Sequence, residues 1–547
     1  MLTPEQVQGL QVAFEQMAEP VTEYLVRDVA RRVSEAGQLT STAAYQIWRL
    51  QELGKSLPEV EAEVSRLLGK QLEEIRRLFT QAAEVGYNFD IDRLHPDAVL
   101  FAENTSIQQM VSAAVALADQ DFQNITQTMG FIGSDGKART LTDAYRNATD
   151  EAFNLIISGA TDYNTAIRRA CAKLISEGIR SIEYDSGMHT SLEAAIRRNM
   201  MGGLGLLVEQ ISERNHDDLG ADGWEISAHA ASAPDHEPIQ GRQYSDEAYQ
   251  RLNNSLRRRI GTLNCGHNAF PIILGVNAPQ YTQSELDRFR EDNAKGVNYE
   301  GRHFDTVYEA TQYQRRIERA IRAQKRRVMV DEGSRDGEQL EQDRIKLRRM
   351  NEEYRRFCRS TSLRPENERL QVSGFGRGHA ARVNAGAERY YQKWSRGIGA
   401  HRSIETLAKY YDVKYTDSPR YELLRGYARA VENDDISPLV GFGRYEEVSK
   451  EIKQRLVGAK TYTGVVIESF TSHFVDRVIG QTSTPHKGMR CGVPIPDALD
   501  ALKNPVRVGA IRVLEDGDVR QTLTGAKADV TISIRDKRLI QTNPNGA

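Results

Sequence analysis

The sequence predicts a mainly α-helical protein with a small irregular α+β module in its middle and a separate α+β domain at its C-terminal end. Apolar residues recur at helical spacing over long stretches of the first 459 positions. Pro and Gly interrupt this pattern within residues 225–271, which indicates an irregular backbone there. From Lys460 onward, short stretches of strand character replace the helical pattern and mark a domain of another type.

Composition limits the classes of function. The chain has 547 residues with a net charge of −3, so the whole chain is not a general binder of polyanions. Its charge is unevenly distributed, because residues 1–100 hold 16 acidic and 10 basic side chains, whereas residues 311–360 hold 15 basic and 9 acidic ones. Such asymmetry indicates different partners for different parts of the chain.

The cysteines and the N-terminal sequence bear on the compartment. Four widely spaced cysteines imply no disulfide framework and favour a reducing environment. The first residues, MLTPEQVQGLQVAFEQM, lack the basic and apolar regions of a signal peptide. No apolar run reaches the length of about 18 residues that a membrane helix needs, so no membrane span is expected.

Helical patterns fill residues 1–220, which we expect to form a helical bundle region. The first pattern covers residues 3–36, with Thr3 as N-cap and Gln6 completing a capping box. Pro20 is expected to kink or break this helix. Further helices are expected over residues 42–53, from Ser56 onward, and over residues 104–130, 142–158, 163–177 and 190–214. The charged face of this bundle either lies in solvent or docks on a larger assembly.

Residues 221–300 are predicted to form a compact α+β module, with WEISAHA and NAFPIIL as short strands. Zinc takes four tetrahedral nitrogen or sulfur ligands, so the module offers a candidate zinc site made of His229, His236, Cys265 and His267. The spacing of seven between the first two histidines is unusual for structural zinc. The alternative, which this spacing favours, is a hydrogen-bonded turn network with buried histidines.

Residues 301–395 are predicted to form a basic helical hairpin followed by a connector. The hairpin covers residues 307–360, and its arginines either lie in solvent or face nucleic-acid phosphates, which need charge but no sequence reading. Residues 371–396, with VSGFGRGHAARVNAG, are predicted to be a flexible connector rich in Gly. No strand precedes its glycines, so a phosphate-binding loop is rejected.

The last two segments differ in type. Residues 396–459 are predicted to be a helical linker segment with turns at residues 417–419 and 435–438. Residues 460–547 are predicted to form an α+β domain that folds alone, with strands in TGVVIESF, VRVGAIRVL, ADVTISIRD and RLIQTN. This domain holds 12 basic and 9 acidic side chains, a balance that is compatible with RNA binding but not diagnostic of it.

The C-terminal domain contains residues suited to phosphodiester cleavage. His473 and Arg477 are four positions apart and therefore share one face of a helix. Cleavage of RNA without a metal needs an acid or base, a role open to His473, and cations for the charged transition state. Arg477 and Arg490 are candidates for bidentate phosphate contacts, and Thr542 for a hydrogen bond from the last strand. The alternative is a folded cap in which these side chains serve only packing.

Two stretches carry family resemblances. SAHAASAPDHEPIQGRQYS followed by LNCGHNAFPIILG resembles the central motif of the phage minor capsid protein 2 family, a relative of the head-morphogenesis proteins of tailed phages. The likeness extends from SIEYDSGMHTSLEAAIRRNM to YEATQYQRRIERAIRAQKRR and NEEYRRF, over roughly the first 395 residues. Two departures concern basic residues that the family usually has, where this chain has Ala233 and Gly266.

The first resemblance implies a structural protein of the virion, located in the phage head and made in the host cytoplasm. Its expected partners are other head proteins, namely the portal, the major capsid protein or the scaffold, together with packaged DNA near the basic hairpin. No cofactor is implied apart from the candidate zinc.

The second resemblance concerns roughly residues 462–545, where SFTSHFVDRVIG, MRCGVPIPDALDALKNP and LIQTNP are similar to barnase–EndoU–colicin–RelE-type RNase domains. It implies a metal-independent endoribonuclease whose substrate is host RNA. The alternative function for the whole chain is therefore a virion-delivered, toxin-like RNase effector whose front part serves as its packaging module.

Overall fold

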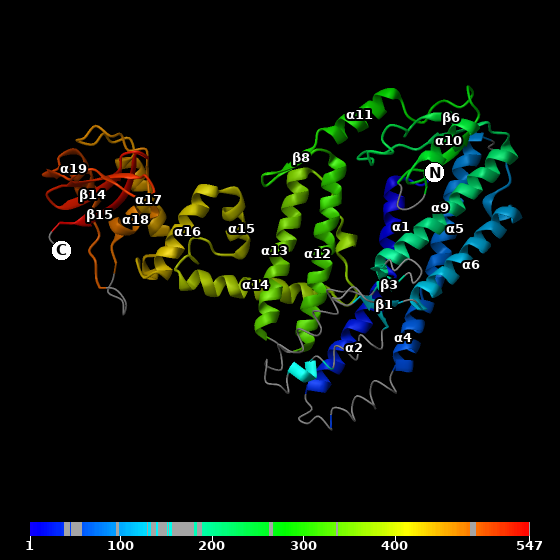
Figure 1. The fold of residues 1–547 in the computed structure, drawn as a ribbon, viewed down its shortest axis with the longest axis horizontal. Coiled ribbons are helices and arrows are strands. Elements are labelled where there is room, and N and C mark those ends of the chain that lie inside the picture. Colours follow the sequence, from blue (N-terminus) through cyan, green and yellow to red (C-terminus); the bar gives the residue numbers. More distant parts are fainter. Residues whose placement is uncertain are drawn as a thin grey trace. The chain divides into compact units, whose positions relative to one another are not determined.

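The computed structural model describes residues 1–37, 44, 57–94, 98–127, 129–132, 138–140, 150, 152–155, 180–182, 189–261, 266–334, 337–481 and 488–545. The chain divides into two compact units, Met1–Val383 and Asn384–Ala547 (Figure 1). The first is mainly helical and the second combines helices with a sheet, so the predicted fold class is confirmed. The helices expected over residues 42–53, 142–158 and 163–177 lie wholly or mostly outside the described residues.

The first unit begins with a helical bundle. Thr3 caps α1 and forms the expected capping box with Gln6. Helix α1 ends before Pro20, which becomes the second residue of α2, where its missing N–H costs no hydrogen bond. The predicted interruption is therefore confirmed. The helices of this bundle are α1 (Pro4–Gln16), α2 (Glu19–Gly37), α4 (Leu57–Gly69), α5 (Leu72–Leu94), η1 (Phe101–Glu103), α6 (Thr105–Gln127) and α9 (Leu192–Leu219).

Helix α9 is the central element of the bundle, because it packs against α1, α5 and α6 (Figure 1). Fully buried side chains such as Phe14, Phe79, Ile196 and Ile211 form the core at these contacts. Burying one such side chain contributes about 1.5–3 kcal/mol, so this core holds the bundle together. A small antiparallel sheet accompanies it, in the order β2-β1-β3-β4, from β1 (Met129–Ile132), β2 (Ala138–Thr140), β3 (Arg180–Ile182) and β4 (His189–Ser191).

A small antiparallel sheet follows the bundle and forms the predicted α+β module. Its strand order is β6-β5-β7, with β5 (Gly223–Ile226), β6 (Gln243–Ser245) and β7 (Ala269–Ile272). The two expected strands are thus present, and β6 is an addition. The helices α10 (Asp246–Ser255) and α11 (Gln283–Ala294) belong to the same module. The Trp224 ring of β5 stacks on both the His216 ring and the Tyr249 ring, with centroids 5.1 and 5.2 Å away.

The predicted helical hairpin is present and has its own core. It consists of α12 (Val307–Ser334) and α13 (Gly337–Thr361), preceded by β8 (Val297–Tyr299) and β9 (Arg302–Phe304) and followed by η2 (Asn367–Leu370). Ile321, Val328, Leu347, Tyr354 and Phe357 are buried between its two helices and neighbouring segments. This core is distinct from that of the bundle.

The predicted flexible connector is wrong, because residues 377–397 form helix α14 (Arg377–Gly397). Val383, Ala387 and Tyr391 are buried at a spacing of four, which gives the helix one apolar face. Gly374 and Gly376 lie before the helix, where Gly374 has a φ of 76°, whereas Gly378 and Gly386 lie within it. The density of glycine therefore outweighed the apolar spacing in the prediction.

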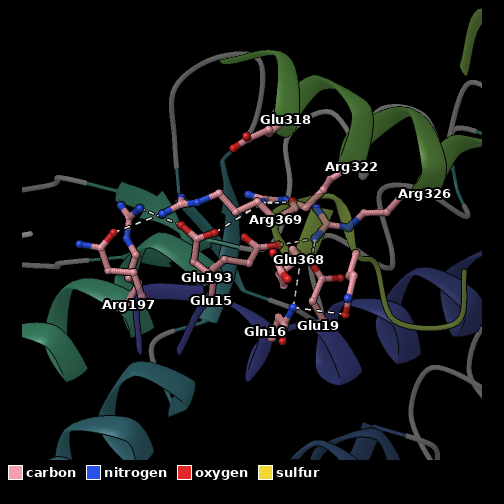
Figure 2. A network of polar contacts seen from close by, with 12 residues as sticks. Glu15, Gln16, Glu19, Glu193, Arg197, Glu318, Arg322, Arg326, Glu368 and Arg369 are labelled. Carbon is pink, nitrogen blue, oxygen red and sulfur yellow. Dashed lines mark hydrogen bonds and ion pairs between the residues drawn. The ribbon is translucent and has the colours of Figure 1, made fainter. Parts of the chain in front are cut away.

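The hairpin meets the bundle through buried ion pairs as well as through packing of α12 on α2 (Figure 2). Arg326 of α12 donates to Glu19 at 2.6 Å and to Glu193 at 2.7 Å. Glu15 of α1 accepts from Arg197 of α9 at 2.7 Å and from Arg322 of α12 at 3.4 Å. These contacts thus join α1, α2, α9 and α12, of which only α1 and α2 are neighbours in the sequence.

The second unit combines helices with a C-terminal sheet. After α14, its helices are α15 (Leu407–Thr416), α16 (Ser418–Glu432), η3 (Pro438–Val440) and α17 (Phe442–Leu456). The remaining elements are β10 (Ser469–Phe470), α18 (Ser472–Ile479), α19 (Ile495–Lys503), β11 (Arg507–Val508), β12 (Arg512–Val513), β13 (Val519–Thr524), β14 (Ala528–Ser533) and β15 (Arg538–Pro544). The strand order is β10-β15-β14-β13-β11, with β12 also on β13, and only β10 runs parallel to its neighbour.

Helices α16 and α17 pack on α18, and α17 also packs on α19. Residues 396–459 therefore belong to the same compact unit as the sheet. The sequence predicted β14 and β15 well, but TGVVIESF and VRVGAIRVL contain only two-residue strands, and β13 was not expected. Among the described helices of both units, none is long and apolar enough to cross a membrane.

Candidate functional sites

The loops around β5 bring together three of the four candidate zinc ligands. The ring of His267 lies 4.3 Å from that of His229 and 5.3 Å from that of His236, measured between centroids. His236 and His267 are each 2% exposed. The fourth candidate, Cys265, lies outside the described residues. The sequence therefore located a real cluster of imidazoles.

Hydrogen bonds fix the state of each ring. His267 Nε2 donates to Gln240 Oε1 at 2.9 Å, and the same oxygen accepts the backbone N–H of His229 at 3.1 Å. His236 Nε2 donates to the carbonyl of Arg258 at 2.9 Å. His229 Nδ1 donates to the carbonyl of Ala230 at 2.9 Å, which leaves its Nε2 as an acceptor. These roles follow from the acceptors present, since a carbonyl oxygen can only accept.

The cluster disfavours positive charge. Burial lowers the pKa of His229, and the neighbouring His236 adds to the effect although the Ala230 carbonyl opposes it. Burial and the other two imidazoles hold the pKa of His267 well below its usual value. Both rings are therefore neutral at pH 7. A cluster of neutral rings suits a hydrogen-bond network, and neutral imidazole is also the form that binds metal.

Gly266 explains how the rings approach so closely. A Cβ added at this position would lie 2.7 Å from His229 Nε2. A larger residue would therefore displace the His229 ring from His267. Where the family usually has a basic residue, this chain therefore has a glycine that leaves room for the His229 ring.

The described residues do not by themselves form a zinc centre. No group of three His, Cys, Asp or Glu side chains in the described part of the chain is arranged to hold a metal ion. His229 Nε2 is buried and has no hydrogen-bond partner among the described residues, so one ring offers a free nitrogen. The geometry favours the network, and zinc stays a prediction that depends on Cys265.

Asp235 anchors the loop that carries His236. It accepts two hydrogen bonds from Arg258, one of them from Nε at 3.1 Å, and Arg258 in turn supplies the carbonyl that binds His236. Burial opposes ionisation of Asp235, but the Arg258 guanidinium holds its pKa below the usual value. Asp235 is thus an ionised structural partner, and its geometry does not suggest a general base.

The second candidate site lies on α18 and β15 of the second unit. Arg477 donates from Nε to His473 Nε2 at 3.3 Å and from Nη1 to Asn543 Oδ1 at 3.0 Å. His473 Nδ1 lies 3.7 Å from Asp476 Oδ2, and the His473 side chain is 40% exposed. A half-exposed imidazole therefore sits between a carboxylate and a guanidinium, which is an arrangement able to exchange a proton next to a bound anion.

Tyr445 of α17 contacts the carboxylate of this arrangement. Its hydroxyl donates to Asp476 Oδ1 at 2.8 Å and lies 3.0 Å from the Ser472 carbonyl. Burial and the Asp476 carboxylate raise the pKa of Tyr445, so the hydroxyl keeps its proton. Sequence reasoning missed both Tyr445 and Asp476. The signal for Asp476 was its place three residues after His473 on the same helix face.

Arg490 lies close to this group but is held by the backbone. Its Nη2 donates to the carbonyls of Asp435 at 3.2 Å and Asp476 at 3.3 Å. Burial and the neighbouring Arg477 lower its pKa, so the two cations lie in each other's field. Paired guanidinium groups of this kind suit a phosphate, which can accept from both.

Thr542 forms a hydrogen bond within the sheet, and its role at this site stays a prediction. Its hydroxyl is buried and donates to the Asp529 carbonyl at 2.7 Å. The next residue, Asn543, points to the opposite face of β15 and contacts Arg477 instead. Side chains alternate along a strand, so these two neighbours serve different contacts.

The comparisons with known proteins address the first unit. The family model described as Phage minor capsid protein 2 matches residues 2–359, more than half of the 547 residues. The chain belongs to the phage minor capsid protein 2 family. None of the curated proteins and none of the solved structures matches it.

The part shared with the phage minor capsid protein 2 family lies within the first compact unit, since the match ends at residue 359 and the unit at Val383. It includes the bundle, the histidine cluster and both helices of the hairpin. The second unit, with His473 and Arg477, lies beyond the matched residues. Membership of the family therefore describes the first unit only.

Several arginines of the hairpin in this capsid-family unit are engaged within the chain. Carboxylates of other segments pair with Arg322, Arg326, Arg344 and Arg356. The guanidinium groups of Arg302 and Arg316 lie over the Tyr313 ring. The hairpin is consequently less free to bind DNA phosphates than its basic composition suggested.

Proposed function

We propose that this chain is a structural minor capsid protein that acts in assembly of the phage head through its first unit. The observation that supports the proposal is the family match over residues 2–359, which falls inside the unit Met1–Val383. A domain with its own core that coincides with a family match is the natural carrier of the family's role. The second unit is then an additional module.

The location and partners follow from this role. We expect the protein to be made in the host cytoplasm and to reside in the virion, where it contacts other head proteins such as the portal, the major capsid protein or the scaffold. Contact with packaged DNA would involve other arginines of the hairpin, because Arg322, Arg326 and Arg344 already bind carboxylates of this chain.

Incorporation into particles tests the structural role. Phage should be produced with the full chain, with a chain that ends at Val383, or with residues 384–547 alone, and the protein in purified heads should be quantified. The first two forms should enter heads at similar levels, and the third should be absent. Heads that contain residues 384–547 but not the first unit would contradict the proposal.

A second candidate function belongs to the second unit: cleavage of RNA without a metal ion. The contact of His473 with Arg477, and of Arg477 with Asn543, supports it, with Arg490 nearby. In this mechanism the two arginines bind the scissile phosphate. His473 removes the proton of the ribose 2′-hydroxyl or donates one to the leaving 5′-oxygen, and water carries out the other proton transfer, while Asp476 stabilises the imidazolium. The cyclic phosphate and a 5′-hydroxyl are the expected products.

Assays of the full-length protein test this activity. With EDTA present, the wild type should cleave RNA, and His473→Ala should lose roughly 10²- to 10⁴-fold in rate. Arg477→Lys should also be impaired, because lysine keeps the charge but not the two-pronged contact. Thr542→Val should remain active, since the hydroxyl already donates to the Asp529 carbonyl. A folded wild type that is inert towards total RNA would leave the second unit as a structural cap.

A further inference from the structure

Five arginines gather where α1, α9, α12 and η2 meet, and we name this group the arginine cluster: Arg197, Arg315, Arg319, Arg322 and Arg369. Arg322 donates to the backbone carbonyl of Arg369 at 2.8 Å and shares Glu15 with Arg197. Figure 2 shows the side chains of Arg197, Arg322 and Arg369 converging between α12 and the bundle.

The carboxylates that act on the cluster are partly engaged by other groups. In the described part of the chain, Glu15 and Glu318 lie among these arginines, and Glu19 and Glu193 also act on Arg322. Glu15 is shared by Arg197 and Arg322. Glu318 is 2% exposed and accepts from the hydroxyl of Tyr354 at 2.8 Å. Arg326 nearby is already matched by Glu19 and Glu193.

In the described part of the chain, three members of the cluster form no ion pair: Arg315, Arg319 and Arg369. Arg369 is only 4% exposed, and its side chain donates to the neutral amide of Gln11 at 3.3 Å. The Nε of Arg197 is also buried, with no hydrogen-bond partner in that part of the structure. A buried charge without a counter-charge is strongly unfavourable.

The electrostatics of the cluster agree with this geometry. Burial lowers the pKa of Arg315, and repulsion by Arg369 and Arg197 lowers it further. Burial likewise lowers the pKa of Arg197. The Glu15 carboxylate opposes this change, whereas repulsion by Arg369, Arg319 and Arg322 adds to it. An anion placed among these groups would relieve the repulsion and accept hydrogen bonds from several planar guanidinium groups at once.

We propose that the arginine cluster is a binding site for one oxyanion, either a carboxylate side chain of a neighbouring protein or a phosphate ion. Both present oxygens that match the fork of a guanidinium group. The site lies between the bundle and the hairpin, so a bound anion would join these two cores. A carboxylate from another head protein would in this way fasten the hairpin during docking.

The surroundings favour a single protruding anion over a DNA duplex. A groove of about 450 Å³ beside η2 is lined by Glu5, Glu366 and Glu368, with Arg364 as its cation. These carboxylates repel every anion, but the repulsion grows with the number of charges that approach, so a duplex with its dense row of phosphates is disfavoured far more than one oxyanion. The burial of Arg369 also places it beyond the reach of a stiff double helix, whereas an extended glutamate side chain can enter.

Thermal unfolding of the full-length protein tests the proposal. Sodium phosphate should raise the melting temperature of the wild type by about 1–2 °C over sodium chloride at equal ionic strength. Arg315→Gln should lose most of this increase, and in chloride it should melt no lower than the wild type, because one repulsive charge is gone. Arg349→Gln, which removes an exposed arginine of α13, should respond like the wild type. Arg319→Gln serves as a second variant if Arg315→Gln misfolds.

Titration with peptides and DNA separates the sources of the anion. A hexaglutamate peptide that stabilises the wild type and Arg349→Gln but not Arg315→Gln would identify a protein carboxylate as the ligand, with hexaglutamine as its control. Stabilisation by phosphate alone would identify the free ion. The proposal is overturned if neither anion distinguishes Arg315→Gln from Arg349→Gln, or if only a short DNA duplex does so.

Discussion

At the scale of single residues, position 266 controls how the central histidines pack. Its missing side chain lets His229 Nε2 approach the backbone, where a Cβ would lie at 2.7 Å. The sequence identified Gly266 only as a departure from the family pattern. It could not show that His229, 37 positions earlier, occupies the space of the absent side chain. Contacts of this kind depend on the path of two loops, which no local pattern encodes.

Gly266→Ala should therefore destabilise the first unit. The added methyl group must push the His229 ring away from His267, and overpacking of this type costs about 1–3 kcal/mol. Urea unfolding of the full-length protein measures the loss. Gly9→Ala is the matched control, because nothing lies within 4 Å of an added Cβ in helix α1. Alanine is the better helix former there, so the control should be neutral or slightly stabilising. Equal effects of both substitutions would refute the role of Gly266.

The neutral histidines also predict a dependence of stability on pH. The pKa of His267 is lower in the folded than in the unfolded chain, whose value is near 6.5. The unfolded chain therefore binds more protons below pH 6.5, and this contribution to stability is complete above that pH and lost as the pH falls. Asp90 opposes the trend, because burial raises its pKa to about 6 and favours the folded state in acid.

The difference between variants isolates the effect of the cluster. The melting temperature of the wild type should fall more between pH 7.5 and pH 5.5 than that of His267→Gln, because glutamine does not take up a proton. His303→Gln, at an exposed position, should follow the wild type. The assignment fails if His267→Gln and His303→Gln lose the same number of degrees.

At the scale of elements, the sequence predicted best where local rules suffice. The capping box at Thr3 and the interruption at Pro20 depend on neighbouring residues only, and both are confirmed. The predicted connector was wrong because Gly374 and its neighbours were given more weight than the apolar spacing of Val383, Ala387 and Tyr391. Strand β13, with the sequence VRQTLT, was missed because its polar residues give no run of strand formers. Its place between β11 and β14 is set by long-range pairing.

The same distinction applies to the C-terminal site. His473 and Arg477 were found because both lie on one helix turn, and they are in contact. Tyr445 was missed because it reaches Asp476 from another helix, α17. The residues from Lys460 onward were expected to fold alone, but α17 buries Phe442, Tyr445, Ile452 and Leu456 in this unit.

A truncation series tests how far the folding unit extends. A fragment of residues 384–547 should unfold in one sharp thermal transition. A fragment of residues 460–547 lacks the large side chains of α17, each of which contributes about 1.5–3 kcal/mol when buried. That sum is comparable with the whole stability of a small domain, about 5–15 kcal/mol. The shorter fragment should therefore show a weak transition or none. A sharp transition in both fragments would show that residues 460–547 fold alone.

At the scale of the whole molecule, two compact units divide two kinds of chemistry. The first unit matches the capsid family and contains the histidine cluster and the buried ion pairs of Figure 2. The second unit contains the exposed imidazole of His473 and its arginine neighbours. Because each unit has its own core, a substitution on the surface of one should leave the stability of the other unchanged.

This independence predicts how a phage with His473→Ala should behave. The substitution affects a side chain that is 40% exposed and removes only one acceptor for Arg477, so the second unit should keep its fold. Heads should form in normal number and contain the variant at the wild-type level. Gly266→Ala, in the first unit, should instead reduce the amount of protein in heads if the loss of stability lowers its supply.

The amount of RNA in cells that express the chain distinguishes the two roles of the second unit. If the second unit is a ribonuclease, cells that express the wild-type chain should lose RNA, and cells that express His473→Ala should not, although both chains enter heads equally. If His473→Ala prevents assembly while its fold, measured by circular dichroism and thermal unfolding, is unchanged, then the exposed imidazole contacts another head protein. The second unit would in that case share the structural role, and its His473–Arg477 surface would be an assembly contact.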